Sequence, residues 1–180
     1  MQVWRDLGKL AVLAAFFGVC FAMLAGAIGI RSPWLGLLLM FYFMSLLKAA
    51  EPLFMLRMPQ ALRTVDPGRV KQGLYRWLGV RGFGVLIRNT PLRYLNSSVY
   101  VAGGKRSLAE LSRKLESTEA IHFWAAVLFT PYIVYICCRG LVAITVWFVL
   151  IQVVFNVYPI LHLRMVRARL SRVKQGLAGC

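Results

Sequence analysis

Long apolar runs dominate this chain, and short turns or strongly basic stretches separate them. Four runs have the length of a membrane-spanning helix, at about 10–30, 34–55, 119–138 and 141–163. A helix rises about 1.5 Å per residue, so about 20 apolar residues cross a hydrocarbon layer of roughly 30 Å. The pattern therefore predicts four transmembrane helices.

The connections between the runs predict how these helices pair. The turn "RSP" at 31–33 joins the first two runs, and "RG" at 139–140 joins the last two. Such short connections are typical of antiparallel helical hairpins. We therefore predict an all-α integral membrane protein with two antiparallel hairpins, in a single membrane domain over 1–180. The first run is longer than a signal-peptide core and shows no clear cleavage site, so we interpret it as a span.

The distribution of positive charge predicts the orientation. The chain carries 22 Lys and Arg against 6 Asp and Glu, a net charge of +16, and its mean hydropathy is +0.67. Nineteen of the basic residues lie near the N-terminus, in the segment 56–118 or in the basic tail 164–180, whereas the two short turns hold only Arg31 and Arg139. By the positive-inside rule, both termini and the segment 56–118 face the cytoplasm. We expect the plasma membrane as the location and no nucleic-acid partner.

The basic segment 56–118 also contains aromatic residues, as in "LYRWLGVRGFGVLIRNTPLRYL" at 74–95. Four aromatic side chains alternate there with arginines: Tyr75, Trp77, Phe83 and Tyr94. This mixture suits the headgroup layer and predicts contact with anionic lipid, while a few arginines could instead bind the phosphates of a soluble donor. The glycines of "GVRGFG" lack the G-x-G-x-x-G order of a dinucleotide site, and we interpret them as permitting turns or close approach to the membrane helices. A capping box at Ser107–Glu110 predicts a short helix that leads into the third span.

The third span begins with two ionisable residues, in "TEAIHFWAAVLFTPY" at 118–132. Glu119 and His122 are three residues apart, so a helix places them on one face. A histidine can act as a general base near neutral pH, and a carboxylate beside it could orient the ring or stabilise its charged form. No serine or cysteine stands at a nucleophile elbow, which favours direct transfer over a covalent intermediate. The cysteines lack metal-ligand spacing, so we expect no metal.

The end of the fourth span is also polar, in "NVYPILHLRMVRARL" at 156–170. An amide such as that of Asn156 needs partners from another helix, either for packing or for chemistry. Pro159 has no N–H, so a backbone carbonyl one turn earlier, close to Phe155 and Asn156, becomes a local acceptor. In the predicted topology this stretch, Glu119 and His122 share one depth near the cytoplasmic interface.

These two stretches resemble the glycosyl-4,4'-diaponeurosporenoate acyltransferases, bacterial membrane enzymes of staphyloxanthin-type carotenoid biosynthesis. The likeness lies in "TEAIHFW", "GVRGF" and "NVYPILHLRMVRARL", and it covers roughly the last 110 residues. It departs at Pro159, one place later than in the family, and at Leu163 and Val166, where polar residues are expected. The resemblance points to six site residues: Glu119, His122, Asn156, Arg164, Arg167 and Arg169.

The resemblance implies transfer of a fatty acyl group from a cytosolic donor such as acyl-CoA to a hydroxyl, such as that of a sugar, on a lipid-linked acceptor. His122 would be the base, Glu119 would hold it, and Asn156 would donate to the oxyanion. The three arginines would bind donor phosphates, and no resident cofactor is expected. Two alternatives stay open: a non-enzymatic scaffold that binds anionic lipid, and a transporter subunit with Glu119 and His122 as proton carriers.

Overall fold

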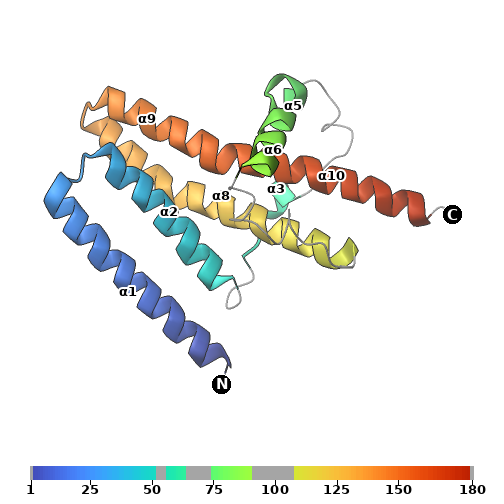
Figure 1. Cartoon of the computed structure of the whole chain (residues 1–180), viewed down its shortest axis with the longest axis horizontal. Coiled ribbons are helices and arrows are strands. Elements are labelled where there is room, and N and C mark those ends of the chain that lie inside the picture. Colours follow the sequence, from blue (N-terminus) through green and yellow to red (C-terminus); the bar gives the residue numbers. More distant parts are fainter. Residues whose placement is uncertain (1, 52–55, 64–73, 91–107, 179–180) are drawn as a thin grey trace. The chain divides into compact units, whose positions relative to one another are not determined.

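The computed structural model describes residues 2–51, 56–63, 74–90 and 108–178 (Figure 1). All the regular elements in these ranges are helices, and four are long and apolar enough to cross a membrane: Val3–Ile28, Pro33–Ala50, Leu108–Cys138 and Val142–Gly176. The predicted helical class and the four candidate spans are thereby confirmed. Two residues named in the predictions for the basic segment, Tyr94 and the capping residue Ser107, lie outside the described residues.

The helices extend beyond the apolar runs that predicted them. Helix α1 (Gln2–Ile28) begins before the first run, and α8 (Leu108–Cys138) joins the helix expected after 107 to the third span without a break. The fourth span consists of α9 (Val142–Gln152), the π-helix η2 (Val153–Val157) and α10 (Tyr158–Ala178), which takes in most of the basic tail. Charged residues at the ends of a span continue a helix readily, so hydropathy alone marks its apolar part rather than its ends.

The chain forms two compact units, and α8 contributes to both. The first unit comprises Met1–Leu56 and Ile121–Val157, and the second comprises Arg57–Ala120 and Tyr158–Cys180. In the first unit α1 packs along α2 (Pro33–Ala50), and α2 also contacts α9 (Figure 1). Glycines with positive φ form the two tight turns, Gly29 at 79° and Gly140 at 71°, where other L-residues would be strained.

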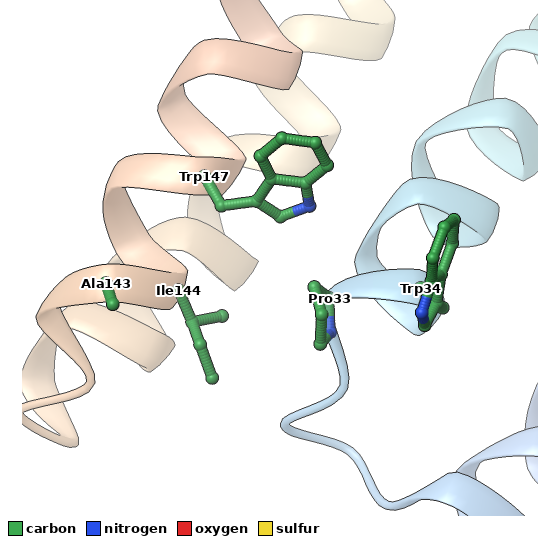
Figure 2. A pocket seen from close by; sticks show the side chains of 5 residues that line it. All are labelled: Pro33, Trp34, Ala143, Ile144 and Trp147. Atoms are coloured by element: carbon green, nitrogen blue, oxygen red, sulfur yellow. The ribbon is translucent and has the colours of Figure 1, made fainter.

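Small and aromatic residues bring α2 and α9 together. A Cβ added to Gly36 would lie 2.2 Å from the ring of Phe148, so the two helices approach too closely for any larger residue at 36. Small residues at such contacts are typical of membrane helices, whose association depends on close packing. Where α2 and α9 begin, a shallow apolar pocket of about 260 Å³ lies between them (Figure 2). It is lined by Pro33, Trp34, Ala143, Ile144 and Trp147, so it offers no ionisable group for chemistry.

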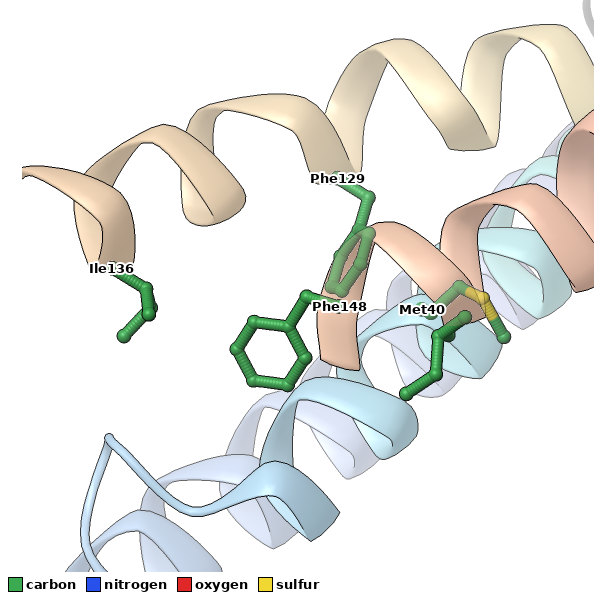
Figure 3. Packing of buried hydrophobic residues seen from close by; sticks show 5 residues of the cluster. Met40, Phe129, Ile136 and Phe148 are labelled. Atoms are coloured by element: carbon green, nitrogen blue, oxygen red, sulfur yellow. The ribbon is translucent and has the colours of Figure 1, made fainter. Parts of the chain in front are cut away.

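The hydrophobic core of the first unit lies among α2, α8 and α9. Figure 3 shows Phe129 and Ile136 from α8, Phe148 from α9 and Met40 from α2 directed towards one another. The rings of Phe129 and Phe148 meet edge to face, with centroids 5.9 Å apart. Tyr132 on α8 donates a hydrogen bond of 2.5 Å to the carbonyl of Ile30, which ties α8 to the α1–α2 turn. This packing fixes the part of α8 that carries His122.

The second unit is built on α10. Two short helices, α5 (Leu74–Trp77) and α6 (Val80–Asn89), follow one another, and α6 packs on α10 (Figure 1). Tyr158 donates to the carbonyl of Leu78 over 2.9 Å, and Phe83 contacts the rings of Tyr158 and His162. A Cβ at Gly84 would lie 2.4 Å from the His162 ring, so this glycine permits the close approach of helices that the sequence suggested.

Candidate functional site

Helix α8 carries both ionisable residues that the sequence singled out. Glu119 and His122 lie three residues apart on its unbroken turns, but they belong to different units of the chain. Glu119 is fully buried, whereas His122 is partly exposed. Each has its own set of contacts within its unit.

The His122 ring is held by a backbone carbonyl. Its Nδ1 atom lies 3.0 Å from the carbonyl oxygen of Phe155. A carbonyl oxygen can only accept a hydrogen bond, so Nδ1 must carry the hydrogen. In the neutral ring the lone pair then stays on Nε2, which is the nitrogen free to take a proton. The contact therefore selects the tautomer that a general base requires.

The sequence around Phe155 explains why this carbonyl is available. Pro159 has no N–H, so it cannot make the helical hydrogen bond to the residue four positions earlier, which is Phe155. The chain there also widens into η2 (Val153–Val157), and π-helical turns of this kind are frequent at functional sites. The acceptor that the sequence predicted near Phe155 and Asn156 is confirmed as Phe155 O.

Asn156 lies beside the same ring, in the middle of η2. It is fully buried, and its Oδ1 has no hydrogen-bond partner among the described residues. Its Nδ2 donates to Oε1 of Gln152 over 2.8 Å, and Nε2 of Gln152 donates in turn to the carbonyl of Ala126 over 2.9 Å. Lys48, near the end of α2, is close enough for its charge to act on the ring. The first unit thus brings together His122 and Asn156 with two polar residues that the site prediction did not include.

Glu119 contacts arginines rather than a histidine among the described residues. Its Oε1 accepts from Nε of Arg164 at 2.6 Å, and its Oε2 accepts from Nη1 of Arg167 at 2.5 Å. Both oxygens of a carboxylate with no exposed surface are therefore engaged. A buried carboxylate needs such partners, because an unpaired charge out of water costs several kcal/mol. The predicted role of Glu119 in holding the His122 ring stays a hypothesis.

The two arginines also bind a short helix of the basic segment, α3 (Gln60–Arg63). Nη2 of Arg164 donates to the carbonyl of Leu62 at 2.5 Å, and Nη2 of Arg167 donates to the carbonyl of Arg63 at 3.2 Å. The Arg63 side chain forms an ion pair with Glu116, one turn before Glu119 on α8. This ionic cluster therefore connects α3, α8 and α10 within the second unit.

Arg169, the third predicted phosphate ligand, has a different environment. It is exposed, and its described contact is a weak one of 3.9 Å to the sulfur of Met165. It lies five positions after Arg164, which turns it away from the face that binds Glu119. The structure brings together Arg164 and Arg167 but leaves Arg169 outside their cluster.

One comparison with known proteins finds a match, and it covers most of the chain. The sequence profile of the family described as glycosyl-4,4'-diaponeurosporenoate acyltransferase matches residues 61–175. The chain belongs to this family. It is therefore a member of a transferase family of carotenoid biosynthesis, and its four apolar helices make it a multi-pass membrane protein. None of the curated proteins and none of the solved structures matches the chain.

The matched range includes both polar clusters apart from Lys48, and it leaves out α1 and α2. Sequence reasoning found His122, Asn156, Glu119 and the arginines but missed Gln152. One signal pointed to it: Gln152 stands four residues before Asn156 in an apolar run, so a helix places the two amides on one face. The carbonyls of Leu62 and Arg63 were not predicted as acceptors.

Proposed function

We propose that this membrane transferase moves a fatty acyl group from a thioester donor such as acyl-CoA to a hydroxyl group of a lipid-linked acceptor. The observation that carries the proposal is the contact of His122 Nδ1 with Phe155 O, since it leaves Nε2 as a base in a chain of an acyltransferase family. A sugar hydroxyl, as on a glycosylated carotenoid, is the acceptor that the family description suggests.

In the proposed reaction His122 Nε2 takes the proton of the acceptor hydroxyl while its oxygen attacks the thioester carbon. The tetrahedral intermediate then collapses, and the carbon–sulfur bond breaks. The departing thiolate takes the proton from the imidazolium, so the products are an ester and a free thiol. The chain supplies a base and needs no covalent intermediate, and no resident cofactor or metal enters the scheme.

For the other predicted residues we propose separate roles. Glu119 anchors the helix that carries His122, because it binds two arginines of α10. Arg164 and Arg167 bring two positive charges against its single negative charge, and Arg169 adds an exposed one. This excess of positive charge supports a role in attracting the phosphates of the donor.

We further propose that the four spans form two antiparallel hairpins in the plasma membrane, with both termini and the segment 56–118 in the cytoplasm. The split of basic residues supports this orientation, and the basic segment would lie on anionic lipid. A cysteine introduced at Arg57 tests it. An impermeant thiol reagent should label that cysteine only after the cells are opened, and labelling of intact cells would reverse the topology.

The function is tested by the lipids of a host that makes the chain. Mass spectrometry should find a lipid heavier by one acyl group in cells with the parent chain, and it should find none in cells with a correctly inserted His122→Ala variant. The purified parent should then form the same ester from acyl-CoA and release free thiol in equal amount. An unchanged lipid profile with the parent chain would favour the non-enzymatic scaffold.

A further inference from the structure

The apolar pocket where α2 and α9 begin lies on a surface that faces the bilayer. Trp34 and Trp147 flank the pocket, and they are 67% and 43% exposed (Figure 2). Both helices belong to candidate spans, so the hydrocarbon of the bilayer surrounds its opening. With a volume of about 260 Å³ and no ionisable group in its lining, the pocket suits the end of a hydrocarbon chain.

The seam between α2 and α9 leads from this pocket to the partner of His122. Trp34 and Phe41 are seven positions apart on α2, so they lie on one face of that helix. The ring of Phe41 meets the ring of Phe155 edge to face, with centroids 5.3 Å apart. The carbonyl oxygen of Phe155 is the group that contacts Nδ1 of His122. The far end of the seam therefore lies at the residue that holds the proposed base.

Exposed apolar side chains follow the seam on both helices. Leu38 lies four positions after Trp34 on α2, and Leu150 and Val154 lie three and seven positions after Trp147 on α9. All three are exposed, and their spacing places them on the same helix faces as the two tryptophans. The segments of α2 and α9 between the pocket and Phe155 contain no charged residue. The surface along the seam is thus open to a hydrocarbon chain over its whole length.

The length of the seam matches one fatty acyl chain. Ala143 and Trp147 precede Phe155 by twelve and eight positions, so the pocket lies roughly 12–18 Å from Phe155 along α9. A lipid acyl chain spans about 15 Å, which is half of a hydrocarbon layer of roughly 30 Å. In an acyl donor this chain begins at the carbon that is attacked, so a donor bound at His122 brings its chain to the near end of the seam.

We propose that the seam binds the fatty acyl chain of the donor, with the thioester near His122 and the methyl end in the pocket beside Trp147. The inference rests on the proposed function, because it takes the bound chain to be the group that is transferred. It adds the residues that select the chain: Trp147 and Ala143 limit the space for the methyl end, so they determine which chain length is used.

The test measures kcat/KM for acyl-CoA donors that differ only in chain length. Burial of each added methylene should raise kcat/KM about fourfold until the chain fills the pocket. Trp147→Ala enlarges the pocket, so the first chain longer than the parent optimum should gain roughly tenfold relative to that optimum. Ala143→Phe fills the pocket, so the parent optimum should lose roughly tenfold relative to a shorter chain. A general loss of stability would not shift the preference in opposite directions.

Two variants outside the pocket are the matched controls. Trp4→Ala removes a tryptophan that is 78% exposed on α1, and Val146→Phe adds a ring at a position of α9 that is 54% exposed. Neither residue lines the pocket. Both variants should keep the chain-length preference of the parent.

Photo-crosslinking locates the chain independently of transfer. The full-length protein in lipid nanodiscs is irradiated with an acyl-CoA that carries a diazirine near the methyl end of its chain. Peptides that contain Trp34 or 143–147 should be labelled, and an excess of unmodified acyl-CoA should prevent this labelling. The same diazirine chain on a phosphatidylcholine should also label α1, because bilayer lipid contacts every exposed span.

Labelling by the acyl-CoA probe outside the pocket, or labelling that excess acyl-CoA does not reduce, would overturn the inference even if the chain transfers acyl groups. Equal chain-length preferences in the parent, Trp147→Ala and Ala143→Phe would do the same. If Trp147→Ala does not fold, Ala143→Phe and the cross-linking decide. The proposed function fails separately, if the parent protein is labelled in the pocket as described but forms no ester from acyl-CoA.

Discussion

Two polar clusters of this chain use residues of the same helix, and they differ in charge and in what remains open. Around Glu119, a buried carboxylate has each oxygen bound to an arginine, and the arginines bind further carbonyls of α3. Around His122, the described hydrogen bond is with a neutral group, the carbonyl of Phe155, and the nearby charge is that of Lys48. In the Glu119 cluster, ionic contacts engage both carboxylate oxygens. In the His122 cluster, the buried Oδ1 of Asn156 and the Nε2 of His122 remain for further partners.

This difference supports the separate roles that we propose for Glu119 and His122. Both oxygens of the Glu119 carboxylate are bound to arginines, so neither is left for a substrate. A histidine held at one nitrogen by a carbonyl keeps the other nitrogen for a substrate. Sequence spacing alone treated Glu119 and His122 as a pair, whereas their described contacts differ: Glu119 binds two arginines of α10, and His122 binds a backbone carbonyl.

Replacing the base should have the largest effect on activity. His122→Ala should lower kcat roughly 10²- to 10⁴-fold, which is the usual contribution of a general base, while the protein inserts and purifies normally. The matched control is His162→Gln, because His162 packs on Gly84 and Phe83 and takes no part in the proposed reaction. Activity per folded molecule in detergent is the measurement. A monodisperse His122→Ala protein with a near-parent rate would remove the distinction between the clusters.

Glu119→Gln should affect stability more than chemistry. The amide keeps the shape but leaves two arginines without their counter-charge, and breaking a buried pair in this way costs on the order of 3 kcal/mol. Thermal unfolding in detergent should show a clearly lower midpoint, and the surviving protein should keep most of its specific activity. Glu116→Gln is the control, since its ion pair with Arg63 is more exposed and contributes at most about 1 kcal/mol. A stable Glu119→Gln protein with a low kcat would instead assign Glu119 to the reaction.

The sequence predicted the helical class, the candidate spans and most of the polar residues, because these depend on local chemistry. Apolar runs of sufficient length determine the spans, and the missing N–H of Pro159 indicated an acceptor that the structure identifies as Phe155 O. These are statements about one segment and its own backbone, so a single sequence can support them.

Partners from distant segments could not be predicted in the same way. Glu119 is 45 positions from Arg164 and three from His122, so proximity in the sequence could not indicate its contact with the arginine. Which arginines turn towards a carboxylate depends on the rotation of α10, and that is set by packing contacts such as Gly84 against His162. Gln152 was passed over because an isolated amide in an apolar run has many possible partners.

A pair of glycines on α6 tests whether the second unit depends on close packing. Gly84→Ala would place a methyl group within 2.4 Å of His162, and such overpacking costs roughly 1–3 kcal/mol. Gly82 lies on the same helix with nothing within 4 Å of an added Cβ, so Gly82→Ala should be neutral or stabilising by up to about 1 kcal/mol. The thermal midpoints of the two variants are compared. Equal midpoints would mean that α6 is not held tightly on α10.

The smallest expected effect concerns Arg169, which separates donor binding from anchoring. Arg164 and Arg167 hold Glu119, so their replacement would mix both roles, whereas Arg169 is exposed and its loss leaves the ionic cluster intact. If its charge attracts donor phosphates, Arg169→Ala should raise the KM for acyl-CoA about two- to fivefold, as expected for an exposed ion pair of up to about 1 kcal/mol, and leave the KM for the acceptor unchanged.

An acyl-pantetheine donor provides the control, because it keeps the thioester and has no phosphate. With that donor the parent and Arg169→Ala should have the same KM, and the difference seen with acyl-CoA should shrink as salt is added. An equal KM for acyl-CoA in both proteins at low salt would leave Arg169 as a topology signal and restrict any phosphate contact to the arginines that also bind Glu119.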